Sequence, residues 1–451
     1  MAGGIFKNAS GKVRPGTYVN LKNGRAVNPV SSERGVAVIP FLEYDWGPRG
    51  EFIQISSGSP DAHIAKLGRS IYSNNSFARM LQLMLMNAAT VYVYIIDGGA
   101  KATKTITLGT GNDAPTMTAT AKYKGSLGNS VQVVSVANPV SGFDISILVD
   151  GEEVELFEGL ATVGDLDGVS EYVDFTGTDS TALVAFASQT LTGGTDTVSG
   201  NTGMTGFLDA CEKIRFNCMA FPNETAALQT ALKTKIKYIR ETIGWKCQAV
   251  ASNFAADYEG IINLVNGFTY DGATLTAAQA TAWLAGATAG ADYVTSLTYK
   301  TVDGATLVNG ELTNEQAEAA IKAGKTFFTT AEDGSVVLEY DTNSLTTISE
   351  DKPADAYKNR PLRVYDSWCN DCLDTFVPGR YDNDSDGWTV VEGIGRAMLQ
   401  AYAEDGAITN VDLENDFLVD QEKSIGDAMY INAGLQAVDS ADKYYITTIA
   451  R

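Results

Sequence analysis

The sequence predicts a multidomain protein of α/β plus all-β class, in which a doubly wound α/β sheet carries an inserted β domain. Short apolar runs of strand length alternate with segments of helical periodicity in both halves of the chain. Between them, residues 101–192 have almost no helical periodicity and are rich in Thr, Val, Gly and Asp. The chain of 451 residues is too long for one ordinary core, so about two to four domains are expected.

Residues 35–100 are expected to form the first part of the α/β region, after an N-terminal arm at 1–34. Residues 35–41 (GVAVIPF) are a continuous apolar run bounded by Gly and Pro, which is typical of a buried central strand. A helix is predicted at 73–86 and a second buried strand at 91–96.

The inserted β domain is predicted at 101–192. Apolar and polar residues alternate at 143–149 and again at 154–157, as in half-buried strands. Asp150-Gly151 lies between these two segments, and an Asp-Gly pair in this position is a strong hairpin signal. We therefore expect a small β-sandwich.

A second α/β segment is expected at 193–345, beginning in the turn-rich sequence LTGGTD at 191–196. Thr313 and Gln316 have the spacing of a capping box, which predicts the start of a helix at 313–323. Strands that alternate with helices of this length favour a doubly wound sheet. The strands are expected at 218–221 and 245–252, and the helices at 203–213, 224–243, 257–265 and 276–290.

The last predicted domain, 346–451, begins with helices at 354–376 and 387–404 and ends in β-rich sequence. Its final segment, 444–449 (YYITTI), has strand character but no tight hairpin partner, and the same holds for 18–21 in the N-terminal arm. A strand without a local partner must pair with a distant part of the chain or with another molecule.

The composition restricts the class of protein. There are 55 Asp and Glu against 33 Lys and Arg, a net charge of −22, which argues against broad nucleic-acid binding and suits a protein that must stay soluble at high copy number. Five cysteines are too few and odd in number for a disulfide framework, so a reducing cytoplasm is expected. The N-terminus lacks the apolar region of a signal peptide, and the most apolar stretch, 80–96, indicates a helix and a strand rather than a membrane span.

Catalytic motifs are absent from the sequence. His63 is the only histidine, and no G-x-S-x-G nucleophile elbow occurs. We therefore expect His63 to be a partly exposed surface imidazole and assign no catalytic residue. The LTGGTD sequence lacks the ending of a phosphate-binding loop and is expected to be a linker or turn.

Two further motifs suggest metal sites only incompletely. Cys369 and Cys372 form a CxxC without the second pair that zinc requires, so buried structural thiols are expected. The acidic run at 382–387 begins like a calcium loop, but Gly393 stands where an EF-hand has its bidentate acid. A helix N-cap at Asp386 explains the run equally well, and we assign neither a metal nor a cofactor.

Taken together, these segments resemble contractile-tail sheath proteins of phages, prophages and phage-tail-like bacteriocins. The similarity covers essentially the whole chain and depends on the order and spacing of several pieces. The pieces are RPGTYVN at 14–20, GVAVIPF at 35–41 with the following Trp46-Gly47-Pro48, AKYKGSLGN at 121–129, LTGGTD at 191–196 and the terminal strand at 444–449.

The resemblance implies a subtilisin-like α/β domain, a β-sandwich domain and a C-terminal α+β domain. It also implies that the N- and C-terminal strands leave their own subunit and augment sheets in neighbouring subunits. Such exchange is a heterologous contact that propagates into rings and helices; the alternative is that both termini pair within their own chain. The residues expected to pair between subunits are Tyr18, Val19, Asn20, Leu21, Tyr444, Tyr445, Ile446, Thr447, Thr448 and Ile449.

A sheath protein would be a structural subunit and not an enzyme, because the subtilisin-like region has neither a histidine nor a serine-protease motif. Its implied partners are further copies of itself in a helical homopolymer of stacked hexameric rings, the tail tube protein, and the baseplate and tail terminator proteins. No nucleic-acid contact and no membrane insertion are expected. The sheath would assemble in the host cytoplasm, become part of the virion tail, and contract to drive the tube through a cell envelope.

The alternative class is an extracellular or surface-layer protein, whose Thr-, Gly- and Asp-rich β composition would be similar. Electron micrographs of the purified protein would separate the two, since a sheath forms long hollow tubes and a surface layer forms a flat lattice.

Overall fold

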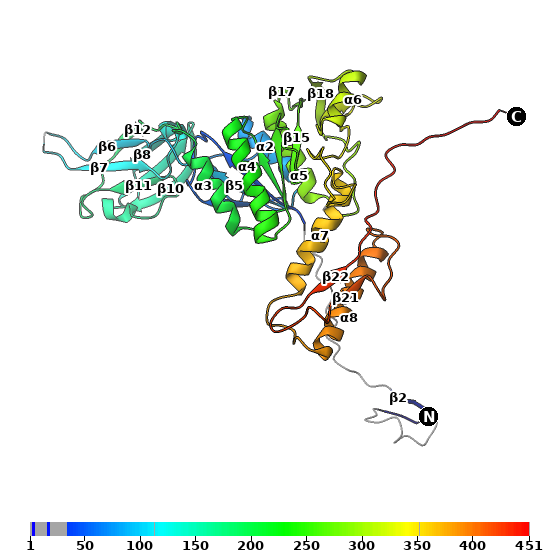
Figure 1. The fold of residues 1–451 in the computed structure, drawn as a ribbon. Helices are drawn as coiled ribbons and strands as arrows, with labels where there is room; N and C mark the ends of the chain where they lie inside the picture. Colours follow the sequence, from blue (N-terminus) through cyan, green and yellow to red (C-terminus); the bar gives the residue numbers. More distant parts are fainter. Residues whose placement is uncertain (1, 5–15, 19–33, 112, 351, 451) are drawn as a thin grey trace.

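The computed structural model describes residues 2–4, 16–18, 34–111, 113–350 and 352–450. Figure 1 shows a β-sandwich at one end, a central α/β sheet with its helices, and a helical C-terminal part that projects from the α/β body. The mixed α/β class with an inserted β-sandwich, expected from the sequence, is confirmed.

The central sheet has six strands in the order β15-β14-β13-β3-β5-β4. All neighbouring strands are parallel except β4, which runs antiparallel to β5. The two separated α/β segments of the sequence therefore build one sheet. The strands are β3 (Val36–Phe41), β4 (Phe52–Ser56), β5 (Thr90–Ile95), β13 (Cys218–Phe221), β14 (Gln248–Ser252) and β15 (Ile261–Leu264).

Helices cover both faces of this sheet, which gives the chain two apolar layers. On one face α2 (Ser76–Leu85) and α5 (Ala277–Gly290) pack together, and their core continues into the sandwich. On the other face lie α3 (Thr202–Ala210) and α4 (Ala226–Tyr238), the latter prolonged by a π-helical turn, η5 (Ile239–Ile243).

The predicted helix at 257–265 is wrong, because these residues contain the edge strand β15. All four residues of β15 are buried, and they pair in parallel with β14. A short apolar run buried on both sides has no periodicity that distinguishes a strand from a helix. Asn263 strengthens the strand assignment, since its side-chain oxygen accepts a hydrogen bond from Phe254 N at 2.8 Å.

The helix α5 is rich in Ala because it is buried on nearly all sides. A Cβ added to Gly286 would lie 2.4 Å from the carbonyl oxygen of Met84, and one added to Gly290 would lie 1.9 Å from that of Asn87. Small residues therefore permit the close approach of α5 to the end of α2.

The sandwich consists of a four-stranded sheet, β10-β9-β8-β12, facing a three-stranded sheet, β11-β7-β6. The predicted hairpin is confirmed, because Asp150 and Gly151 both have positive φ angles of 52° and 88° between β9 and β10. The strands are β6 (Thr103–Thr107), β7 (Thr116–Ala121), β8 (Val131–Ala137), β9 (Phe143–Val149), β10 (Glu152–Leu160), β11 (Val173–Thr176) and β12 (Phe186–Thr190).

Trp46 joins the sandwich to the α/β body. Its side chain is completely buried, meets Tyr123 edge to face at 5.5 Å and stacks on Tyr172 at 6.0 Å between ring centroids. The chain enters and leaves the sandwich side by side, through bridges from Ala100 to Thr195 and from Thr103 to Thr192.

Smaller elements complete the α/β body. The capping box predicted at Thr313 is confirmed, with Gln316 as its partner at the start of α6 (Asn314–Lys322). The remaining elements are α1 (Ile64–Leu67), β16 (Gly267–Tyr270), β17 (Ala273–Thr274), β18 (Ala305–Asn309), β19 (Phe328–Thr330) and β20 (Val336–Leu338).

The C-terminal part is built on two long helices, α7 (Asn359–Thr375) and α8 (Ser385–Glu404), as the sequence predicts. A short antiparallel pair, β21 (Phe417–Val419) and β22 (Ile431–Ala433), packs with them around a separate apolar core. Residues 443–450 then extend away from the body as a single trace (Figure 1).

Candidate functional site

The C-terminal segment is fixed to its own subunit only as far as Asp442. Val438 N donates a hydrogen bond to Ala407 O at 2.8 Å, and the buried ammonium of Lys358 pairs with Asp439 at 2.5 Å and with Asp442. Burial alone would lower the pKa of Lys358, but hydrogen bonds to both carboxylates outweigh it and raise the pKa above that of a free lysine. The anchor therefore stays charged throughout the neutral range.

Beyond this anchor, residues 443–450 are all exposed. Tyr444, Tyr445, Ile446 and Ile449 are 78, 91, 85 and 81% exposed. No described residue of the chain hydrogen-bonds to this segment. Four large apolar side chains exposed within six residues indicate a contact surface, and their β-branched and aromatic character is that of a strand.

The N-terminal arm leaves the body at Arg34. Its Nε donates to Ala291 O at 2.7 Å and its Nη2 to Thr288 O at 3.0 Å, at the C-terminal end of α5, where free carbonyls favour a cation. Burial and then the nearby Arg363 lower the pKa of Arg34 to about 10.

Of the N-terminal residues expected to pair between subunits, Tyr18 ends the short strand β2 (Gly16–Tyr18), which pairs in parallel with β1 (Ala2–Gly4). Val19, Asn20 and Leu21 lie outside the described residues.

The outer edge of β22 is open. Hydrogen-bonded pairs alternate with non-bonded pairs in an antiparallel ladder. The hydrogen bonds at the two ends of this sheet therefore show which residues of β21 and β22 are bonded to each other. These bonds run from Asp420 N to Tyr430 O and from Gly434 N to Asp416 O, each 2.8 Å long. The N–H and C=O groups of Ile431 and Ala433 must therefore point away from β21, and no described residue bonds to them.

The opposite edge of this small sheet is covered by α8. Val419 N, which points outward from β21, donates to the carboxylate of Glu392 at 3.0 Å. Gly395 lies directly under Phe417, since a Cβ at this position would come within 2.1 Å of the ring. Only the β22 side of the sheet can accept a further strand.

The joint between the α/β body and α7 is polar. Arg240 holds Asp366 with two buried hydrogen bonds of 2.6 and 2.8 Å. Lys246 N donates to Asn370 Oδ1 at 2.8 Å, which adds a second contact one turn farther along α7. Directional bonds of this kind fix the orientation of the C-terminal part on the body.

The candidate chemical motifs lie on helices or at their starts. Cys369 and Cys372 lie on α7, where burial raises the pKa of both thiols, that of Cys372 to about 12. The acidic run caps α8, but the N-cap is Asp384 and not Asp386 as predicted, and its carboxylate accepts bonds from the N–H groups of Asp386 and Gly387. His63 is half-buried at the start of α1.

Two other kinds of site have no candidates among the described residues. No helix there is long and apolar enough to cross a membrane. No group of three or more His, Cys, Asp or Glu side chains in the same part of the chain is arranged to hold a metal ion.

The open edge of β22 and the polar joint could not be located from the sequence. A strand of three residues has too little alternation to be recognised, and the partners at the joint are separated by more than a hundred residues.

Comparison with protein families matches three consecutive segments. Residues 97–196 match the phage tail sheath protein β-sandwich domain, residues 197–344 its central domain, and residues 351–451 the phage tail sheath C-terminal domain.

Individual relatives agree with these matches. The chain is 32% identical to the phage-like element PBSX protein XkdK of Bacillus subtilis, over 99% of both chains. A sheath tail protein from Desulfitobacterium hafniense, known from its crystal structure, is 36% identical and superposes with a TM-score of 0.82 over 96% of this chain and 99% of its own.

A more distant match shows the fold alone. The helical sheath of the anti-feeding prophage in its contracted state is 13% identical, with a TM-score of 0.56 over 98% of this chain and 99% of its own. The close relatives, which span the chain from end to end, together with the three domain matches show that it belongs to the phage tail sheath protein family.

Proposed function

We propose that this chain polymerises helically around a tail tube and contracts to drive that tube through a cell envelope. Membership of the phage tail sheath family supports this proposal, and so does the fold shared with a sheath imaged in its contracted state. The family gives no support to the surface-layer alternative. The role is structural, and we propose no catalytic activity.

The observation that supports this assembly mechanism is a strand-like segment and a sheet edge that both lack partners. Residues 444–449 have strand character, exposed apolar side chains and no described partner, and the edge of β22 has two outward N–H and two outward C=O groups without partners among the described residues. A two-stranded sheet is marginal alone and gains stability when further strands are added. We propose that the terminal segment of one subunit adds to β22 of another.

Residues 18–21 are proposed to pair between subunits in the same way, through the second terminal arm. Two exchanged strands per subunit would link each copy to more than one neighbour. A heterologous link of this kind repeats without closing into a dimer, as a helical sheath requires.

The finer features implied by the sequence remain part of the proposal. They are the subtilisin-like topology of the α/β domain, the domain boundaries at 34, 100, 192 and 345, and assembly in the host cytoplasm before incorporation into the tail. The partners proposed in addition to other copies of the chain are the tail tube, baseplate and tail terminator proteins.

Proline substitutions in the terminal segment test the exchange. Successive N–H groups of a strand point to opposite edges, so either Ile446 or Thr447 directs its N–H group toward β22. Proline at that position removes this hydrogen-bond donor. We expect deletion of 443–451, and whichever of Ile446→Pro and Thr447→Pro removes the N–H group that faces β22, to give a folded, soluble monomer by circular dichroism and analytical ultracentrifugation, because the segment contributes nothing to its own core.

The matched control is Thr447→Ala, which keeps the N–H group and should polymerise like the original protein. Tubes formed by the deletion variant would show that assembly does not depend on the terminal segment. An unfolded deletion variant would show that the segment belongs to the subunit's own core.

A further inference from the structure

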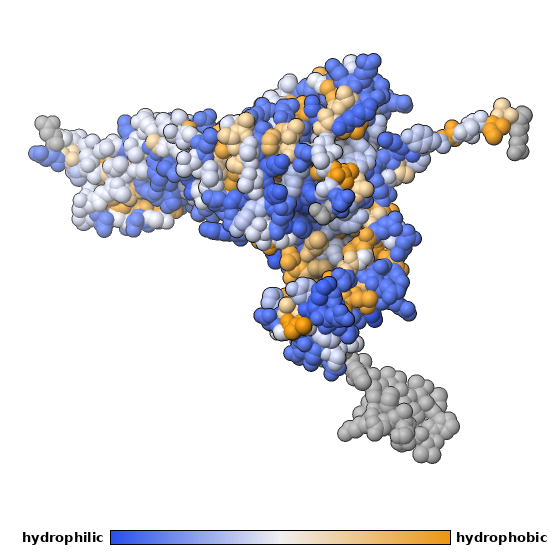
Figure 2. All heavy atoms as spheres, viewed as in Figure 1, coloured by the Kyte–Doolittle hydropathy of each residue, from blue (hydrophilic) through white to orange (hydrophobic). Residues whose placement is uncertain are grey.

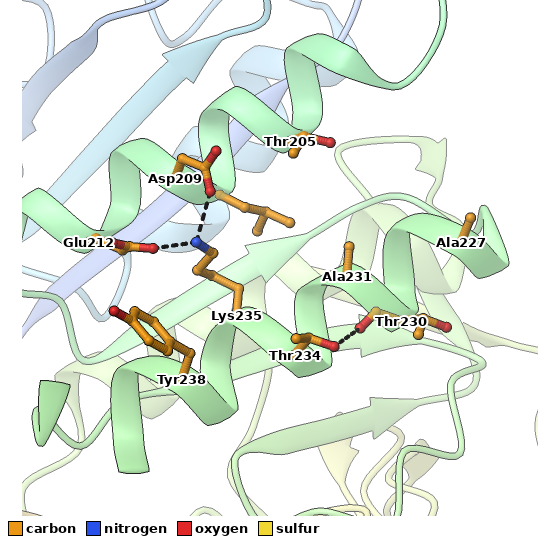
Figure 3. A pocket seen from close by; sticks show the side chains of 10 residues that line it. Thr205, Asp209, Glu212, Ala227, Thr230, Ala231, Thr234, Lys235 and Tyr238 are labelled. Atoms are coloured by element: carbon orange, nitrogen blue, oxygen red, sulfur yellow. Dashed lines mark hydrogen bonds and ion pairs between the residues drawn. The ribbon is translucent and has the colours of Figure 1, made fainter. Parts of the chain in front are cut away.

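A groove of about 570 Å³ lies between α3 and α4, on the face of the α/β body remote from α5 (Figure 3). Its walls are made of small side chains such as Thr205, Ala227 and Thr230, so the two helices leave an open channel between them. Lys235 crosses the groove from α4 and bridges Asp209 at 2.8 Å and Glu212. The groove is mainly apolar with a charged rim.

A second hollow of about 300 Å³ continues the groove toward α7. Glu212 belongs to both hollows, and the second is lined by Ile243 from the end of α4 and by Leu373 from α7. Tyr238, Ile243 and Leu373 are each 43% exposed, which is unusual for such large apolar side chains on neighbouring elements. We call the two hollows together the α3/α4 surface.

The charge of this surface differs from that of the rest of the chain. The two hollows are lined by three cations, Lys213, Arg215 and Lys235, and by two anions, Asp209 and Glu212, and the exposed Lys237 precedes Tyr238 on α4. The whole chain has a net charge of −22, so most other surfaces of two copies would repel each other. The α3/α4 surface can receive an acidic partner.

A strongly acidic part of the chain lies in the C-terminal domain. Residues 381–430 contain twelve acidic and only two basic side chains. Val390, Ile425 and Tyr430 lie within this stretch and are 52, 75 and 52% exposed, and Figure 2 shows apolar residues gathered over the C-terminal domain. The exposed residues of this stretch, which we call the acidic surface, combine negative charge with apolar groups.

We propose that the α3/α4 surface of one subunit binds the acidic surface of a second copy of this chain. The two surfaces complement each other in charge and in apolar character, and both occur once on every subunit. Because they are different surfaces of one molecule, the contact propagates as the exchanged strands do. The inference rests on the proposed self-assembly and adds to it a contact between folded domains, independent of the terminal arms.

Filling the groove gives the first test. Ala227 is exposed and lines the groove, so Ala227→Trp should leave the fold intact and block the partner. We expect the critical concentration for polymerisation to rise at least about ten-fold, as for other well-packed interface positions. Ala319→Trp, at an exposed site on α6 outside both surfaces, is the matched control and should polymerise normally.

Charge reversal gives the second test and identifies the partner. Lys213→Glu with Lys237→Glu should weaken polymerisation and make it less sensitive to salt, since both lysines are exposed. Adding Glu422→Lys and Asp427→Lys, exposed on the acidic surface, should restore assembly in the same chain. Lys322→Glu on α6 controls for the loss of positive charge.

The outcomes separate this inference from the proposed function. Normal tubes from Ala227→Trp and from the reversed lysines, together with loss of tubes on deletion of 443–451, would overturn the domain contact and leave strand exchange standing. Normal tubes that no longer bind a tail tube protein would also overturn it, because the occupant would then be a different protein. A parent chain that forms no tubes would overturn the proposed function first.

Discussion

Arg240 and Asp366 form a buried ion pair between the α/β body and the C-terminal domain. The two side chains are 4 and 9% exposed, and the guanidinium also donates to Cys247 O at 2.8 Å. Burial would by itself lower the pKa of Arg240, but the charge and hydrogen bonds of Asp366 outweigh burial and raise it, so the arginine remains charged. A charge so buried is stable only with its partner.

Removing the carboxylate should therefore be costly. We expect Asp366→Ala to lower the free energy of unfolding by about 3–5 kcal/mol in urea titration, because Arg240 would be left as an uncompensated buried charge. Asp209→Ala, which removes a 65% exposed partner of Lys235, should cost only about 0–1 kcal/mol. Equal losses in the two variants would show that the joint is not held by this pair.

At this scale the sequence predicts local motifs well. The capping box at Thr313 and the turn at Asp150-Gly151 are confirmed, because both depend on residues only one to three positions apart. The cap of α8 is misplaced by two residues, since several acids in one run offer competing N-caps. The ion pair at the joint could not be predicted, because its partners meet only after the whole α/β body has folded.

Among the elements, α8 contains two glycines that lie in different surroundings two residues apart. Gly395 is buried against Phe417 of β21, whereas Gly393 is exposed, and a Cβ added there would meet nothing within 4 Å. The pair separates the effect of packing from that of helix propensity.

Alanine at these positions should have opposite effects. Gly395→Ala forces Phe417 and β21 away from α8, and we expect it to destabilise the C-terminal domain by about 1–3 kcal/mol and to impair polymerisation, since β21 supports β22. Gly393→Ala should stabilise by about 0.5–1 kcal/mol, because alanine is the better helix former. Thermal unfolding of both variants checks this, and a stable Gly395→Ala variant would mean that α8 and β21 can separate freely.

Long elements are predicted from the sequence more accurately than short ones. The predicted helices at 354–376 and 387–404 correspond to α7 and α8, because amphipathic periodicity repeats over several turns. The sequence predicts a helix where the edge strand β15 lies, and it indicates a β-rich C-terminal end without locating β22. Both strands are four residues long or fewer, so tertiary pairing and not local pattern determines them.

For the whole molecule, the sandwich is a module at one end, attached at one junction (Figure 1). Its entering and leaving strands lie side by side, with Ala100 N donating to Thr195 O at 3.1 Å. Its core is continuous with the body near Trp46, which contacts Tyr123 and Tyr172. The sandwich could therefore be deleted without rerouting the chain, but its deletion would expose apolar side chains at the junction.

Replacing residues 101–192 with a short Gly/Ser linker should leave a folded protein that still polymerises. We expect a lower melting temperature, because exposing Trp46 costs about 1.5–3 kcal/mol. Electron microscopy of negatively stained tubes and differential scanning calorimetry measure the two effects. An unfolded or monomeric product would show that the sandwich takes part in the body's fold or in assembly.

The presence of an inserted β domain can be predicted from composition, since the sequence becomes rich in Thr and Gly at about residue 101. The relation between subunits does not follow in the same way. A strand that has no partner in its own chain can be recognised from the sequence, but the edge that receives it is visible only when the fold shows which backbone groups remain free.

Electron cryomicroscopy of the assembled polymer would show directly whether the terminal strand is exchanged. We expect a tube in which residues 444–449 of one subunit lie as an added strand beside β22 of another, with backbone hydrogen bonds to Ile431 and Ala433. A tube in which residues 444–449 fold back on their own subunit, with the β22 edge unoccupied or covered by a different element, would contradict this expectation.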